Sequence, residues 1–135
     1  MAISDSQSNA DIFYGSEPAV ITLKEAVTKG DAIGYYNGWR KALATVTTVY
    51  QMRCVASEDG VTSQDITAYF GLVIMGGRLS GGTAEAALYV AEGSSSGQYT
   101  ETAPTTTGDA NKKVGSMITD SVAILFPNVN DDSVA

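Results

Sequence analysis

The sequence has no histidine and only one cysteine, and these absences limit its chemistry before any motif is considered. Without histidine, the serine–histidine–aspartate and cysteine–histidine mechanisms and histidine-ligated metal sites are excluded. A single cysteine forms no intrachain disulfide and cannot close a zinc site. Because Cys54 lies in an apolar run, we expect a buried, inert thiol rather than a nucleophile.

Charged residues are also scarce, at 17% of the chain, against about 25% in typical soluble domains. Exposed helices normally carry glutamate and lysine, so a surface rich in serine, threonine and glycine favours strands and turns. The net charge is −7 with only eight lysines and arginines, which disfavours nucleic-acid binding because phosphate contacts need clustered cations. We interpret the dispersed acidic residues as a solvated surface, with an acidic binding patch as the alternative.

Long apolar runs are missing as well. None approaches the roughly 20 residues of a membrane span, and no basic segment followed by an apolar run predicts a signal peptide. We therefore expect a soluble protein made in the cytosol, with neither a membrane nor nucleic acid among its partners. The 135 residues are enough for one domain with a hydrophobic core.

What the sequence does contain is a series of short alternating apolar segments between turn residues, which is typical of an all-β fold. The strongest local signal is Asn37-Gly38, because both residue types tolerate the positive φ angles of a type I′ turn. This pair predicts a hairpin, with the Tyr36 and Trp39 rings packing across its strands. The strands of this hairpin are expected at residues 32–36 and 39–43. One or two strands are expected within 45–55, and single strands at 19–23, 66–75, 87–91, 98–102, 114–118 and 122–126.

Two of these segments need comment. Thr62 and Asp65 match a capping box, so a helical turn is an alternative there, but the alternation in 66–75 favours one long strand. In 122–126 both faces are apolar, which predicts a central strand or one at an interface.

We divide the chain into an extended N-terminal arm (1–17), a β-domain (18–128) and a polar C-terminal tail (129–135). The β-domain is expected to be a small β-barrel or β-sandwich. Ile12, Phe13 and Tyr14 form an apolar cluster in the arm, which is either a first strand or an element that docks on another chain.

Motifs for chemistry are absent. The glycine-rich segment "GGRLSGG" lacks the Gly-Lys-Ser/Thr ending of a phosphate loop, and "NVNDD" lacks the glycine and distant glutamate of a calcium loop. A hydrolase that uses two carboxylates stays open, but no spacing supports it. We therefore predict no catalytic residue, no metal and no cofactor, and expect a structural protein that acts through surface complementarity rather than an enzyme.

Two segments resemble virion proteins of tailed phages. The segment "GGTAEAALYVAEGSSSGQYTETAPTTTGDANKKVGSMITDSVAILFPN" is similar to a pattern of a Leu-Tyr strand, a glycine turn, Thr-x-Ala-Pro-Thr and a final strand that closes on Phe-Pro. The upstream "VTKGDAIGYYNGWRKA" resembles the Lys-Gly-Asp-Ala-hydrophobic-Gly hairpin of capsid decoration (cement) proteins.

The resemblance implies a small β-tulip-like protein on the virion exterior that binds the expanded phage head and bridges major capsid protein subunits. It also implies self-association on the capsid, for which a trimer is one arrangement. On this interpretation Ile12, Phe13 and Tyr14 dock on a coat protein or a neighbouring copy. Trp39 and Arg40 are second candidates, because aromatic residues and arginine are enriched at interface centres, although Trp39 could serve only hairpin packing.

The alternative is a head-fibre, tail-associated or receptor-binding component, because the C-terminal pattern also occurs in such proteins. This alternative hypothesis predicts binding to host cells or sugars, with exposed tyrosine and tryptophan rings stacking on the sugar.

Overall fold

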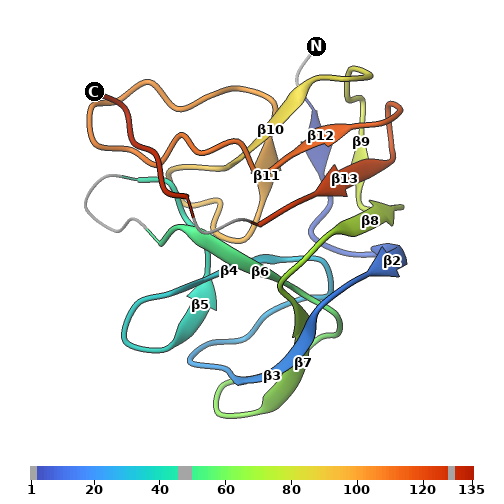
Figure 1. Cartoon of the computed structure of the whole chain (residues 1–135), viewed down its shortest axis with the longest axis vertical. Helices are drawn as coiled ribbons and strands as arrows, with labels where there is room; N and C mark the ends of the chain where they lie inside the picture. The colour runs from blue at the N-terminus through green and yellow to red at the C-terminus, as the bar shows by residue number, and fades with distance from the viewer. Residues whose placement is uncertain (1–2, 46–49, 128–129) are drawn as a thin grey trace.

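The computed structural model describes residues 3–45, 50–127 and 130–135, and no helix is present among them. The predicted all-β fold is confirmed. Figure 1 shows the strands in two main groups, with β10 to β13 in one half of the molecule and β3 to β7 in the other. One sheet has the order β11 (Tyr99–Thr100), β10 (Ala87–Val90), β12 (Gly115–Met117), β13 (Ala123–Leu125), β8 (Val73–Gly76) and β2 (Asp11–Gly15). The other has the order β3 (Pro18–Thr22), β7 (Asp65–Tyr69), β6 (Met52–Ala56), β4 (Ala32–Tyr35) and β5 (Trp39–Lys41).

The main core lies between these two sheets. Alternate residues of the six-stranded sheet point into it, including Met75, Leu88 and Leu125, and they meet Met52 and Val55 of the five-stranded sheet. This arrangement is sandwich-like, because each sheet buries one face against the other.

A second, smaller core lies on the other side of the five-stranded sheet and contains Ile33, Cys54 and Ile66. The sheet curls around it, and an isolated bridge joins Leu23 to Trp39. The sheet order nevertheless leaves β3 and β5 at opposite edges, so the barrel that we considered as one form of the fold is not closed.

The prediction of one long strand at 66–75 is wrong, because the chain bends there and passes from one sheet to the other. β7 ends at Tyr69 in one sheet and β8 begins at Val73 in the other. The neighbouring chain turns the same corner between β2 and β3, and the two corners are joined by hydrogen bonds from Ser16 N to Leu72 O (3.0 Å) and from Leu72 N to Ser16 Oγ (2.7 Å). The corner carries the β2–β8 pair into one sheet and the β3–β7 pair into the other.

The predicted hairpin is confirmed, with one difference in its loop. Asn37 and Gly38 have φ angles of 51° and 121°. Tyr35 pairs with Trp39, so three residues rather than two form the loop. Tyr35, not Tyr36, is therefore the cross-strand partner of Trp39, with ring centroids 5.0 Å apart.

Both chain ends, which were predicted as an extended arm and a polar tail, contact the β-domain. β1 (Ser4–Asp5) pairs with β9 (Leu79–Ser80), and β2 is a strand of the six-stranded sheet. At the other end, Asp131 forms an ion pair with Arg53, and Ser133 forms a bridge with Ala110. Both ends are held because their polar groups find fixed partners on the domain.

Two expectations reach residues that are not described. The strand expected at 45–55 includes 46–49, which lie outside the described residues, and 52–56 form β6. The boundary expected between 128 and 129 also lies outside them. At Thr62, where a helical turn was an alternative, the chain makes a hydrogen-bonded turn instead.

Candidate docking surfaces

The outer face of the six-stranded sheet is unusually apolar. Strands that bury one face normally place polar residues on the other, but here the row that crosses the sheet is Tyr14, Ile74, Ile124 and Ser116. We define the outer apolar face as the apolar residues of this row together with their apolar neighbours. Its members are Phe13, Tyr14, Leu72, Ile74, Val122, Ile124 and Phe126. Large exposed apolar patches on soluble proteins mark interaction sites.

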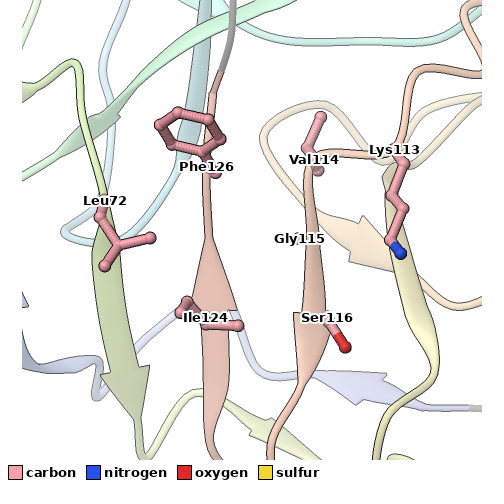
Figure 2. Close-up of a pocket in the computed structure, with 7 residues that line it drawn as sticks. All are labelled: Leu72, Lys113, Val114, Gly115, Ser116, Ile124 and Phe126. Atoms are coloured by element: carbon pink, nitrogen blue, oxygen red, sulfur yellow. The ribbon is translucent and has the colours of Figure 1, made fainter.

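A shallow groove crosses this face where β8, β13 and β12 lie side by side. Its volume is about 350 Å³, and its lining is Leu72, Lys113, Val114, Gly115, Ser116, Ile124 and Phe126. Figure 2 shows the Leu72, Ile124 and Phe126 side chains on adjacent strands, with Lys113 at the rim. At Gly115, β12 packs so closely on β13 that a Cβ would collide with the backbone oxygen of Ile124.

The predicted docking residues of the arm border the same face. β2 is an edge strand, paired with β8, and its register shifts between Ile12 and Tyr14, so that Phe13 is the extra residue of a β-bulge. Ile12 turns inward and packs against the main core. Phe13 and Tyr14 remain 64% and 51% exposed, and the Phe13 ring lies against Gly76 of β8.

Trp39 and Arg40, the second pair of candidates, lie on β5 in the other sheet. The structure therefore does not bring the two sets of predicted residues together. Trp39 packs edge-to-face on Tyr35 and on Phe70, which supports the hairpin-packing role that we considered for it. The neighbouring rings of Tyr35 and Tyr36 are 60% and 57% exposed, so residues 35–40, the hairpin tip, form a separate aromatic surface.

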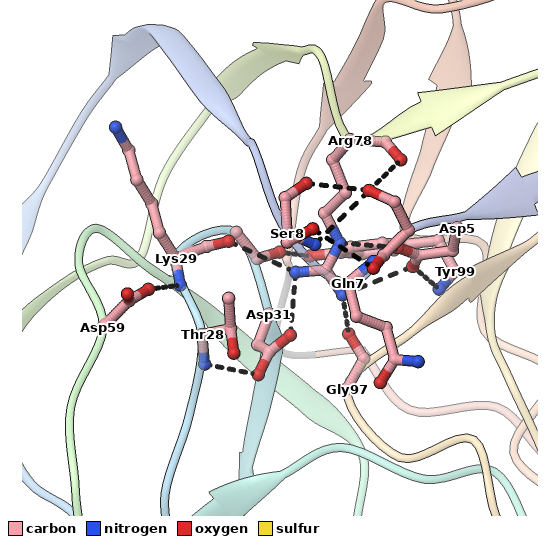
Figure 3. Close-up of polar contacts among 12 residues, drawn as sticks. Asp5, Gln7, Ser8, Thr28, Lys29, Asp31, Asp59, Arg78, Gly97 and Tyr99 are labelled. Atoms are coloured by element: carbon pink, nitrogen blue, oxygen red, sulfur yellow. Dashed lines mark hydrogen bonds and ion pairs between the residues drawn. The ribbon is translucent and has the colours of Figure 1, made fainter.

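A charged cluster around Arg78 is buried. The Arg78 guanidinium donates from Nε to Asp5 Oδ1 (2.7 Å) and from Nη1 to Asp31 Oδ1 (2.7 Å), and all three side chains are at most 5% exposed. Figure 3 shows these contacts, together with bonds from Arg78 to the carbonyl oxygens of Lys29 and Gly97. We assign this cluster to folding, because it ties the N-terminal strand to two distant loops.

Burial shifts the pKa of several titratable groups, of which Asp31 and Cys54 are two. Burial raises the pKa of the Asp31 carboxyl above its ordinary value, although the Arg78 guanidinium opposes this shift. Burial also raises the pKa of the Cys54 thiol to about 12, as expected for an inert cysteine. Among the described residues, no group of three histidine, cysteine or acidic side chains is arranged to hold a metal ion. The described part of the chain also has no helix long and apolar enough to span a membrane.

Sequence reasoning found part of this surface and missed part. The doubly apolar segment 122–126 did predict a central or interface strand, and β13 is central in its sheet. The groove was missed because its lining comes from three strands. Arg78 was missed because it lies in a glycine-rich segment that reads as a turn, and its partners are 47 and 73 positions away in the sequence.

In comparisons with known proteins, no family model, no curated protein and no solved structure matches this chain significantly. The resemblance to capsid decoration proteins therefore stays a prediction.

Proposed function

We propose that the protein is a structural virion protein that binds the exterior of a phage head and stabilises the expanded capsid by bridging major capsid protein subunits. The observation that carries this proposal is the outer apolar face with its groove. Such a face is suited to docking on another protein, because burying exposed aromatic and aliphatic side chains supplies the free energy of association.

The edge position of β2 adds to this proposal. An edge strand presents backbone N–H and C=O groups that can pair with a strand of a partner. The bulge at Phe13 restricts such pairing to part of the strand. We therefore assign the main contact to side chains of the face, with Phe13 and Tyr14 at its border.

Binding only the expanded lattice would stabilise it by linkage. A ligand that binds one state of a lattice shifts the equilibrium toward that state, and a subunit that contacts two coat proteins adds the gain of multivalency. The experiment is to mix the purified protein with expanded capsids that lack it, and to measure co-sedimentation and the capsid melting temperature. Failure to co-sediment, with no rise in melting temperature, contradicts the proposal.

The contribution of the face is tested with Phe13→Ser. Burial of a phenylalanine side chain contributes about 1.5–3 kcal/mol, so we expect affinity to fall about 10- to 100-fold. The matched control is Val20→Ser on β3, since Val20 is 69% exposed and lies on the other sheet. Equal effects of the two substitutions would contradict the assignment of the face.

A further inference from the structure

The hairpin tip is a second surface whose rings are both exposed and fixed. Tyr35 packs edge-to-face on Trp39, and Tyr36 packs on Tyr50 with centroids 5.4 Å apart. Two hydrogen bonds hold the Tyr36 backbone. Its N–H donates to Gly38 O (3.0 Å), and Arg40 Nε donates to the Tyr36 carbonyl oxygen (2.8 Å). Surfaces that are ordered before binding lose little conformational entropy on association.

Two cationic residues, Lys24 and Arg40, lie at the hairpin tip. Lys24 N donates to Trp39 O (2.9 Å), and the Lys24 side chain lies against Gly38. Across the described residues, neither Lys24 Nζ nor the guanidinium of Arg40 contacts a carboxylate.

The other two arginines differ from Arg40, because each forms an ion pair. Arg53 forms an ion pair with Asp131, and Arg78 forms ion pairs with two aspartates. A chain of net charge −7 therefore leaves two cations without an acidic partner beside its exposed aromatic hairpin.

The charges restrict what can cover the tip. A partner that buries the Tyr35 and Tyr36 rings also removes water from Arg40 and Lys24. Burial of a charge without a partner is strongly unfavourable, whereas a carboxylate that forms paired hydrogen bonds with a guanidinium offsets that cost. Tyrosine, tryptophan and arginine together are the residue types that dominate the binding energy of protein interfaces.

We propose that the hairpin tip binds an acidic surface of a protein partner, with carboxylates that pair with Arg40 and Lys24. The inference rests on the proposed function in one respect: the partner is a coat subunit other than the one that contacts the outer apolar face. The six-stranded sheet carries that face and the five-stranded sheet carries the tip. One chain can therefore contact two subunits through surfaces of different chemistry.

The test uses charge reversal. Arg40→Glu and Lys24→Glu each change the net charge by the same amount as Lys29→Glu, the matched control, whose side chain points away from the buried cluster in Figure 3. Arg40→Glu also removes the hydrogen bond to Tyr36 O and could disturb folding. Lys24→Glu avoids this problem, because the Lys24 side chain makes no hydrogen bond within the described structure. We expect each tip variant to weaken binding to expanded capsids about tenfold or more, and the control to bind within about twofold of wild type. If both tip variants bind as the control does, the inference is overturned while the proposed function stands.

A second readout is independent of capsids. Trp39 is the only tryptophan in the chain, so its fluorescence reports on the tip alone. We expect a peptide of alternating glutamate and leucine to shift Trp39 emission, and a lysine–leucine peptide and the Arg40→Glu variant to show no shift. If wild-type protein fails to sediment with capsids, the proposed function falls, and this titration still decides the inference. Polygalacturonate, an acidic polysaccharide, is titrated as a further probe. The inference is overturned if the acidic peptide causes no shift, or if only polygalacturonate causes one.

Discussion

Removal of the Asp5 carboxylate tests whether the N-terminal segment is part of the folded domain or a free arm. The side chain of Asp5 is 3% exposed and accepts hydrogen bonds from Arg78 Nε (2.7 Å) and from Tyr99 N (3.0 Å). Asp5→Ala leaves these two buried donors without an acceptor. Each orphaned donor costs about 1–3 kcal/mol, so we expect the free energy of unfolding to fall by about 4 kcal/mol.

The corresponding change in melting temperature follows from chain length. An unfolding entropy of about 2.1 cal/mol/K per residue gives about 0.28 kcal/mol/K for the chain, and hence a decrease of about 14 °C. Urea unfolding followed by Trp39 fluorescence measures the free energy, and calorimetry measures the temperature. Asp11→Ala is the control, because Asp11 is exposed and its loss changes the net charge equally. A loss below about 1 kcal/mol, or one equal to the control, would refute the role of the cluster.

Three further predictions concern single sites. Gly115→Ala places a Cβ against the Ile124 backbone oxygen between two central strands, and should lower the free energy of unfolding by about 1–3 kcal/mol in urea titrations; unchanged stability would contradict the close packing there. The Cys54 thiol, with its pKa raised to about 12, should react with a thiol reagent at pH 8 only after unfolding, and rapid labelling of native protein would contradict its burial. The raised pKa of Asp31 favours the folded state below the unfolded pKa, and this contribution is lost as pH rises through the folded pKa. The stability of Asp31→Asn relative to wild type should therefore improve as pH rises from about 4, in urea titrations at several pH values; a difference that stays constant or declines would contradict the shift.

The local pattern of the sequence was sufficient for the fold class and for several strands. Alternation placed the strands that became β10 and β13, and Asn37-Gly38 placed the hairpin, because these signals depend only on neighbouring residues. The corner at 70–72 could not be predicted in the same way. It depends on pairing with residues 16 and 17, more than 50 positions earlier.

The sites show the same division between local and distant determinants. The sequence identified Ile12, Phe13 and Tyr14 as an apolar cluster that could dock, but the groove beside them exists only once three strands are adjacent. The sequence predicted an extended arm over residues 1–17. The structure holds it through Asp5, whose buried partners Arg78 and Tyr99 no local pattern could indicate.

The central claim is that the outer apolar face docks on the expanded phage head. A cryo-electron microscopy map of expanded capsids saturated with the purified protein tests it most directly. We predict density on the capsid exterior, with the six-stranded sheet turned toward coat subunits and Phe13 and Ile124 within the contact. A map with no added density, or one in which this face points to solvent, would contradict the account.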